Sequence, residues 1–218
     1  IRGGHVRDAR RLRFVRNAKK LSASGPEDRG KYLYRLDELR AALDGILASG
    51  RFGRSIDKAR VAVGGHSLGG FTALGLSGTI KEMHVPSIKA LLLFSTGAGG
   101  YLYTAAEHAA VKVPSMSFMG ETEAEEKRGS KTMLELALKL NGTLPEPKHF
   151  LIVKGAGHFS FNDAFADTRA AKRMSGTQAQ FDVIRRYAVA ILETHAAGRK
   201  DAQLERGDTM LTRYDKKP

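Results

Sequence analysis

Two kinds of hydrophobic pattern alternate along the chain, and they predict different elements. In residues 35–49 an apolar side chain recurs at every third or fourth position, which predicts an amphipathic helix ending at Gly50. The residues of this stripe are Leu36, Leu39, Leu43, Ile46 and Leu47. Further on, four short and nearly continuous apolar runs are typical of buried strands: residues 60–64, 89–95, 114–119 and 149–154.

Helix-like segments lie between and after these runs. Residues 71–76 follow the first run, and residues 131–140 precede the stop signal Asn141-Gly142. Residues 178–195 carry apolar side chains on one helical face. Strands that alternate with helices indicate an α/β protein, in which a mostly parallel sheet is covered by helices on both faces.

The size and composition fit one domain with a core of its own. The chain has 218 residues, of which 42% are hydrophobic. No apolar run approaches the roughly 20 residues that a helix needs to cross a bilayer, so we expect no membrane span. Because the sequence has no Cys, it excludes a disulfide framework, a thiolate zinc site and a Cys nucleophile.

The charge is strongly basic and unevenly spread. Lys and Arg number 36 against 23 Asp and Glu, a formal net charge of +13. In the first twenty residues the only acidic side chain is Asp8, and the basic ones are Arg2, Arg7, Arg10, Arg11, Arg13, Arg16, Lys19 and Lys20. Such an arm can bind a polyanion, but no zinc-finger spacing, aromatic RNA-binding pattern or helix-turn-helix signature accompanies it. A solvated surface is therefore the simpler interpretation, and nucleic-acid binding is the weaker one.

One motif combines a reactive side chain with a defined backbone context. Gly65-His66-Ser67-Leu68-Gly69-Gly70 directly follows the first apolar run and precedes a helix-like segment, which is the strand–turn–helix setting of a G-x-S-x-G nucleophile elbow. In that turn a strained serine exposes its hydroxyl, and we expect side chains at positions 65 and 69 to collide with the neighbouring strand and helix. Ser67 is therefore the predicted nucleophile.

A serine hydroxyl becomes a good nucleophile only beside a base that a carboxylate orients. His158 is the preferred base, because it lies in the loop after the last apolar run, at the carboxyl edge of the expected sheet. His66 is expected to point away from the site. If the acid lies between nucleophile and base it is a Glu, since residues 68–157 contain no Asp. Glu123, in the acidic loop after the third apolar run, is preferred, and Asp163 is the alternative.

These residues resemble the α/β-hydrolase superfamily, in particular platelet-activating-factor acetylhydrolases, dienelactone-hydrolase-like esterases and chlorophyllase or cutinase relatives. The resemblance covers residues 35–198 and rests on the elbow motif, on Val113-Pro114 opening a strand that ends at Gly120, and on Gly155-Ala156-Gly157-His158. It implies the α/β-hydrolase fold and a serine esterase or lipase that works through an acyl-enzyme, without a metal or organic cofactor. It also implies that Glu123, three residues after Gly120, stands where the family usually has Asp.

The resemblance further implies an oxyanion hole, to which the backbone N–H of Leu68 contributes one donor. The family takes its second donor from a loop near the first strands, which we do not find before residue 35. We therefore expect a fold that lacks the usual N-terminal strands, and the second donor has no assigned residue. The expected organisation is a basic lead-in segment (1–34), a catalytic core (35–198) and a polar tail (199–218).

Aromatic residues near the motif suggest the kind of substrate. Phe71, Phe159 and Phe161 are expected to line an apolar site beside the nucleophile, which favours an apolar acyl or aryl ester. A small ester, a lipid and a polyester surface all fit this expectation. The alternative function is a noncatalytic hydrolase-like module, whose basic arm binds a polyanion or a partner chain.

Overall fold

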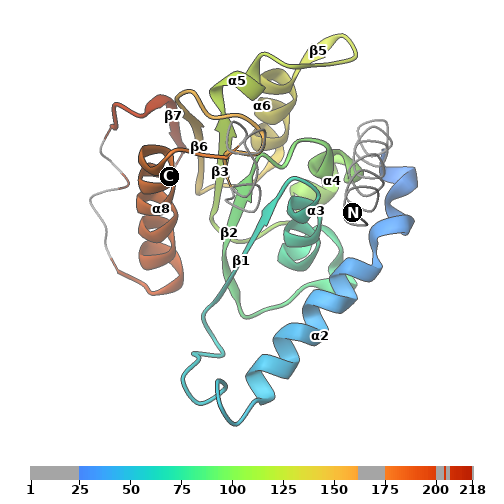
Figure 1. Cartoon of the computed structure of the whole chain (residues 1–218). Helices are drawn as coiled ribbons and strands as arrows, with labels where there is room; N and C mark the ends of the chain where they lie inside the picture. Colours follow the sequence, from blue (N-terminus) through green and yellow to red (C-terminus); the bar gives the residue numbers. More distant parts are fainter. Residues whose placement is uncertain (1–24, 162–174, 200–203, 205–206, 218) are drawn as a thin grey trace, which may run out of the picture.

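The computed structural model describes residues 25–161, 175–199, 204 and 207–217 of the chain. At its centre lies a five-stranded sheet with the spatial order β1, β2, β3, β6, β7 (Figure 1). These strands are β1 (Val61–His66), β2 (Ile88–Phe94), β3 (Ser115–Gly120), β6 (Lys148–Val153) and β7 (Leu211–Lys217). The first four are parallel, and β7 runs antiparallel to β6. The four predicted strands and their parallel arrangement are confirmed.

Helices form near all four predicted segments. They are α2 (Tyr34–Ala48), α3 (Leu68–Leu74), α6 (Met133–Thr143) and α8 (Gln178–Ile191). Shorter elements connect them: η1 (Pro26–Tyr32), η2 (Gly75–Thr79), η3 (Lys81–Met83), η4 (Gly97–Leu102), α4 (Ala105–His108), α5 (Glu121–Ala124), β4 (Lys127–Arg128), β5 (Lys131–Thr132) and η5 (Leu192–Ala196). Thr132 and Thr177 begin α6 and α8 with capping boxes, which satisfy backbone N–H groups that a helix start leaves unpaired.

The sheet is covered on both faces, because successive side chains of a strand point to opposite sides. In β2, Leu91 and Leu93 pack in one core cluster with residues of α2 and α3, whereas Leu92 packs in another with residues of α8. Residues of α6 cover the β3–β6 part of the sheet. Figure 1 shows α8 on one side of the strands and α2, α3 and α4 on the other. The predicted layered α/β architecture is confirmed.

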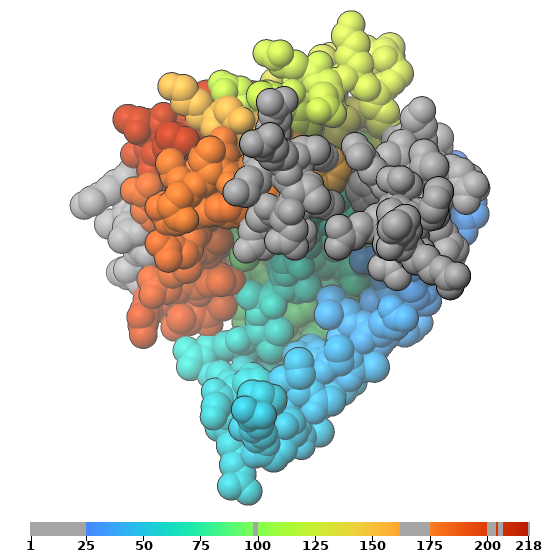
Figure 2. Space-filling view, viewed as in Figure 1, coloured from blue at the N-terminus to red at the C-terminus, as the bar shows by residue number. Residues whose placement is uncertain are grey.

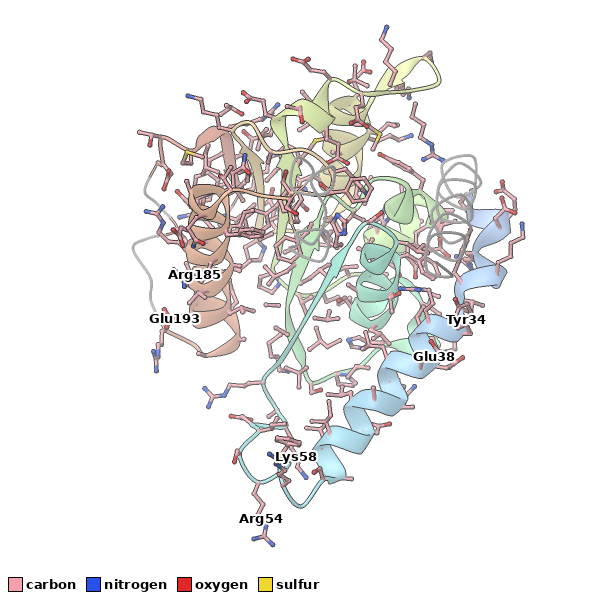
Figure 3. All side chains as sticks on the ribbon, viewed as in Figure 1. Tyr34, Glu38, Arg54, Lys58, Arg185 and Glu193 are labelled. Atoms are coloured by element: carbon pink, nitrogen blue, oxygen red, sulfur yellow. The ribbon has the colours of Figure 1, made fainter. Side chains whose placement is uncertain are left out.

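Helix α2 is confirmed, but most of its apolar stripe does not pack against the core. Leu36 is fully buried, whereas Leu39 and Ile46 are 40% and 47% exposed. The helix runs along the outside of the molecule, and its end projects together with the loop of residues 49–60 (Figures 1 and 2). Figure 3 shows the outward side chains of this region, among them Tyr34, Glu38, Arg54 and Lys58. The stripe meets the core only near the start of the helix, where α2 contacts α3.

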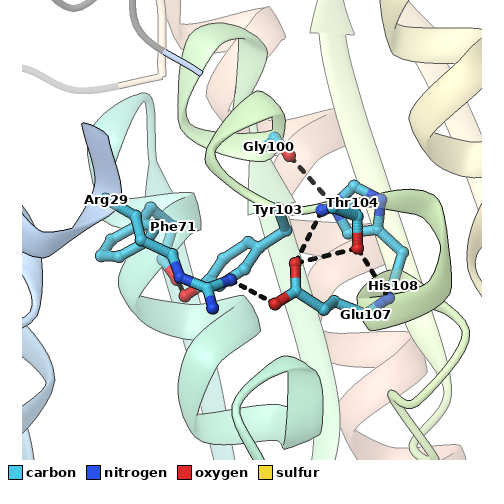
Figure 4. A network of polar contacts seen from close by, with 7 residues as sticks. All are labelled: Arg29, Phe71, Gly100, Tyr103, Thr104, Glu107 and His108. Atoms are coloured by element: carbon cyan, nitrogen blue, oxygen red, sulfur yellow. Dashed lines mark hydrogen bonds and ion pairs between the residues drawn. The ribbon is translucent and has the colours of Figure 1, made fainter. Parts of the chain in front are cut away.

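Polar contacts fasten the segments beside the carboxyl ends of the strands (Figure 4). Arg29 of η1 forms an ion pair with Glu107 of α4. Glu107 also accepts hydrogen bonds from the backbone N–H and the hydroxyl of Thr104, at 2.8 and 3.0 Å, which caps α4. The Tyr103 hydroxyl donates to the carbonyl oxygen of Phe71 at 2.9 Å. The η4–α4 segment is therefore held against α3.

Strand β7 lies in the segment that we expected to be a polar tail. Leu211 and Tyr214 pack against the cluster that includes α8, and the Tyr214 hydroxyl accepts from Nδ1 of His149 at 3.0 Å. The expectation missed this strand because only two of its seven side chains join the cluster, as suits an edge strand with one polar face. The sheet thus extends beyond residue 198, while most of the lead-in segment lies outside the described residues.

Candidate active site

Ser67 occupies a tight turn between β1 and α3. Its backbone has φ 54° and ψ −122°, a conformation that L residues rarely adopt. A Cβ atom at Gly65 would lie 2.1 Å from the carbonyl oxygen of Gly69, so position 65 admits only glycine. This strand–turn–helix geometry is that of a nucleophile elbow.

The glycines of the turn do not all have the role that we expected. No described atom lies within 4 Å of a Cβ built at Gly69, so the collision expected there is absent. A Cβ at Gly70 would instead lie 2.3 Å from Cγ2 of Thr96. The expectation for position 69 is wrong because the close neighbour of α3 is the segment after β2, and Gly70 faces it.

Three side chains from three strand ends meet at the carboxyl edge of the sheet. Nε2 of His158 lies 3.0 Å from Oγ of Ser67, and Nδ1 of His158 lies 2.7 Å from Oε1 of Glu123. Ser67 follows β1, Glu123 belongs to α5 after β3, and His158 follows β6. The Glu123 side chain is 2% exposed and that of His158 is 25% exposed. The structure therefore brings together the three residues that we predicted as nucleophile, acid and base.

The loops after β3 and β6 are joined directly, which explains how residues 35 positions apart come into contact. The backbone N–H of Thr122 donates to the carbonyl oxygen of Ala156 at 2.9 Å, and that of Gly155 donates to Oε2 of Glu121 at 2.8 Å. A Cβ at Gly120 would lie 2.5 Å from the same Ala156 oxygen. Glu121 thus links the two loops by a hydrogen bond.

Farther along the acidic loop, burial raises the pKa of Glu126, and the nearby Glu123 raises it further.

His66 lies beside the site, so the expectation that it points away is wrong. Its ring centroid is 4.9 Å from that of His158, and its Nε2 lies 2.6 Å from the His158 carbonyl oxygen. Because a carbonyl oxygen only accepts, Nε2 of His66 carries the proton of this bond. Burial lowers the pKa of His66 below its ordinary value, against the opposing effect of the hydrogen bond to the His158 carbonyl oxygen.

Ser95 is a residue of the site that sequence reasoning missed. It directly follows β2, is 3% exposed, and its hydroxyl donates to Oε2 of Glu123 at 2.5 Å. The signal in the sequence was its place at the end of an apolar run, where parallel strands present side chains to one shared edge. No motif marks it, which is why it escaped notice.

The three phenylalanines of the predicted apolar site have different positions. Phe159 meets the His158 ring edge to face at 4.9 Å, and Phe161 lies 6.2 Å from the His66 ring. Phe71 is fully buried in the core, where it stacks on Tyr103 at 4.8 Å. Phe159 therefore contacts the predicted base and Phe161 lies near His66, whereas the expectation that Phe71 lines the site is wrong because its ring is part of the core. The alternative acid, Asp163, lies outside the described residues.

Three further findings concern metals, membranes and charge. Within the described ranges, no group of three or more His, Cys, Asp or Glu side chains is placed to share a metal ion. No described helix combines the length and apolar character that a membrane crossing requires. The basic cluster of the first twenty residues, and with it the polyanion hypothesis, lies outside the described part of the chain.

Comparison with known proteins identifies the fold. Neither a family model nor a curated protein matches the sequence. A ferulic acid esterase from Streptomyces cinnamoneus matches in structure with a TM-score of 0.64 and 18% identity, over 88% of this chain and 57% of that one. A dienelactone hydrolase from Anabaena variabilis matches with a TM-score of 0.51 and 14% identity, over 74% and 59%. The chain has the α/β-hydrolase fold, and it spans less than two thirds of the length of either neighbour.

Proposed function

We propose that this protein is a serine-dependent carboxylic-ester hydrolase that acts on an apolar acyl or aryl ester. The observation that carries the proposal is the continuous path of hydrogen bonds from Ser67 through His158 to Glu123, built from three strand ends of one parallel sheet. Two neighbours in fold are named as an esterase and a dienelactone hydrolase, which supports a hydrolase.

In the proposed mechanism His158 first acts as a base. Oγ of Ser67 attacks the ester carbonyl carbon while Nε2 of His158 takes the hydroxyl proton, and the carbonyl oxygen becomes an oxyanion. The carboxylate of Glu123 stabilises the imidazolium that forms and keeps its Nδ1 proton directed at Oε1. When the oxyanion collapses, the bond to the alkoxy oxygen breaks, and His158 returns the proton to the leaving alcohol.

The resulting acyl-enzyme is then hydrolysed. A water molecule gives a proton to His158 and attacks the acyl carbon, after which the acid leaves and Ser67 regains its hydroxyl proton. Leu68 is the first residue of α3, so its N–H has no partner within the helix and is the proposed oxyanion donor. Phe159 and Phe161, next to the two histidine rings, are the proposed apolar contacts for the substrate.

Active-site labelling tests this proposal directly. A fluorophosphonate probe reacts only with an activated serine, so we expect it to modify the purified chain, and peptide mass spectrometry to locate the adduct on Ser67. The rate of hydrolysis of a short-chain aryl ester should fall in proportion to the fraction of the chain that is labelled. An unlabelled chain that binds nucleic acid in a salt-sensitive way would instead support the noncatalytic module.

A further inference from the structure

A second serine lies at the far end of the predicted triad. The Ser95 hydroxyl donates to Oε2 of Glu123, while Oε1 of the same carboxylate faces Nδ1 of His158. An ionised carboxylate can accept about four hydrogen bonds, so these two leave part of its capacity free. Because Glu123 is 1% exposed, bulk water does not supply the remainder.

A small cavity adjoins Glu123 on the side of the sheet that α6 covers. Its volume is about 20 Å³, and Ser95, Thr96, Ser117 and Glu123 form the polar part of its lining. About 10–15 Å³ is enough for one water molecule, provided that the molecule finds two to four polar partners. The cavity is therefore large enough for one water and too small for a substrate.

Two hydroxyls of this lining lack a partner among the described residues. They are Oγ1 of Thr96 and Oγ of Ser117, and the two residues are 6% and 8% exposed. A buried hydroxyl without a hydrogen bond destabilises the fold, and most buried polar groups have a partner, so two such groups in one small cavity are an unusual arrangement. A hydroxyl both donates and accepts, so each can bind water that also donates to a carboxylate.

We propose that the cavity behind Glu123 is a binding site for one ordered water molecule, and that this water and Ser95 together hold the carboxylate toward His158. The water donates to Glu123 and is bound by Ser117 and Thr96. Ser95 and Ser117 are then positioning residues, because they act through Glu123 and not on the substrate. The catalytic part of this inference rests on the proposed ester hydrolysis, whereas the water site does not.

A crystal structure of the full chain, at a resolution that reveals ordered waters, tests the site itself. We expect one water within hydrogen-bond distance of both Ser117 Oγ and a Glu123 carboxylate oxygen. Density for a cation with short contacts to these oxygens would overturn the assignment, and so would a cavity without any density.

A matched pair of serine variants tests the positioning role. Ser115 and Ser117 lie on β3 two residues apart, both are buried, and both hydroxyls lack a partner among the described residues, but only Ser117 lines the cavity. We expect Ser117→Ala to lower kcat for an aryl ester several-fold with little change in KM, and Ser115→Ala to leave both constants unchanged. Equal effects of the two variants would overturn the proposal.

Ser95→Ala should act in the same way and more strongly, because it removes a direct hydrogen bond to the carboxylate. We expect kcat to fall about tenfold or more, because a hydrogen bond to a charged group is stronger than one between neutral groups, while KM changes less than about twofold. A rise in KM without loss of kcat would show that Ser95 contacts substrate and does not position Glu123.

A measurement independent of catalysis separates this inference from the proposed function. A proton between Nδ1 of His158 and Oε1 of Glu123, which lie 2.7 Å apart, should give a low-field proton NMR resonance in the resting protein. We expect Ser95→Ala and Ser117→Ala to broaden or shift it, and Ser115→Ala to leave it unchanged. If the wild-type chain hydrolyses no ester and yet shows this pattern, the proposed function fails and the positioning role stands. A resonance unchanged in every variant overturns the positioning role.

Discussion

Two serine turns, one after β1 and one after β2, both have a positive φ angle, but their hydroxyls contact different groups. Ser67 and Ser95 have φ angles of 54° and 42°, and no other non-glycine residue among the described ones has a positive φ. Each N–H donates to the neighbouring strand, Ser67 to the Phe94 carbonyl at 3.0 Å and Ser95 to the Phe118 carbonyl at 2.8 Å. Both turns therefore place a serine hydroxyl at the same edge of the sheet.

The two turns differ in what each hydroxyl faces. Ser67 is partly exposed, and its hydroxyl lies beside Nε2 of His158, the proposed base. The Ser95 hydroxyl is buried and faces the carboxylate of Glu123, to which it only donates. Backbone strain therefore does not by itself make a nucleophile. The neighbouring base and access to solvent distinguish the two serines.

The largest expected effect is that of removing the Ser67 hydroxyl. Ser67→Ala should lower kcat for an aryl ester on the order of 10⁴-fold or more, because no other group in the proposed mechanism attacks the carbonyl. Steady-state assays on purified protein measure this loss. If Ser67→Ala retained activity and Ser95→Ala abolished it, the two serines would have to exchange the roles that we propose.

The next effect concerns Glu123, the proposed acid, which contacts the Ser95 hydroxyl directly and is linked to the Ser67 hydroxyl through His158. Glu123→Gln should lower kcat on the order of 10³- to 10⁴-fold, because a neutral amide stabilises the imidazolium poorly. Glu121→Gln is the matched control, since its side-chain oxygen can still accept from the backbone N–H of Gly155. Assays of both variants at pH 7 give the comparison, and a comparable loss in Glu121→Gln would mean that the acid is misassigned.

A third effect depends on the contact between the two turns. Gly70→Ala should lower the free energy of unfolding by about 1–3 kcal/mol, because the new Cβ would overlap the side chain of Thr96, next to Ser95. Gly69→Ala, on the same helix but without a described neighbour within 4 Å of the new Cβ, should be neutral or stabilising by about 0.5–1 kcal/mol. Urea unfolding followed by circular dichroism measures both changes. Equal stabilities of the two variants would show that position 70 does not pack closely against the Thr96 side chain.

Backbone strain should respond differently at the two serines. Ser67→Gly relieves the unfavourable φ and should raise the free energy of unfolding by about 1 kcal/mol while activity is lost. Ser95→Gly relieves similar strain but also removes a hydrogen bond to a buried carboxylate, worth about 1.5–3 kcal/mol, so stability should fall or stay the same. Thermal and urea unfolding measure both variants. An equal gain in stability would indicate that the Ser95 hydroxyl contributes nothing to folding.

The smallest expected effect is a pH dependence at the first turn. The folded protein holds the pKa of His66 below its ordinary value of 6.5, chiefly through burial, whereas the unfolded chain takes up a proton near that value. The stability due to neutral His66 is therefore complete above pH 6.5 and is lost as the pH falls through the folded pKa. Urea midpoints between pH 7.5 and 5 should decline less steeply in His66→Gln than in the wild type. An unchanged slope would contradict the pKa shift.

Much of the fold followed from the order of apolar and polar residues. Four continuous apolar runs and four helix-like segments correspond to the parallel strands and the long helices of the structure. Strand β7 could not be found in this way, because an antiparallel edge strand buries few side chains. The exposure of most of the α2 stripe could not be predicted either, since periodicity predicts a helix and one apolar face but not whether anything covers that face.

The sequence by itself predicted the strained turn at Ser67 and the choice of His158 and Glu123 as its candidate partners, because a G-x-S-x-G motif between a strand and a helix leaves few partners at one sheet edge. Only the tertiary structure decided that Gly70 rather than Gly69 is the crowded position, that His66 lies beside His158, and that the Ser95 hydroxyl donates to Glu123. These contacts join residues 26 or more positions apart in sequence. Local pattern cannot specify them, because loop geometry and packing between strand ends set their distances.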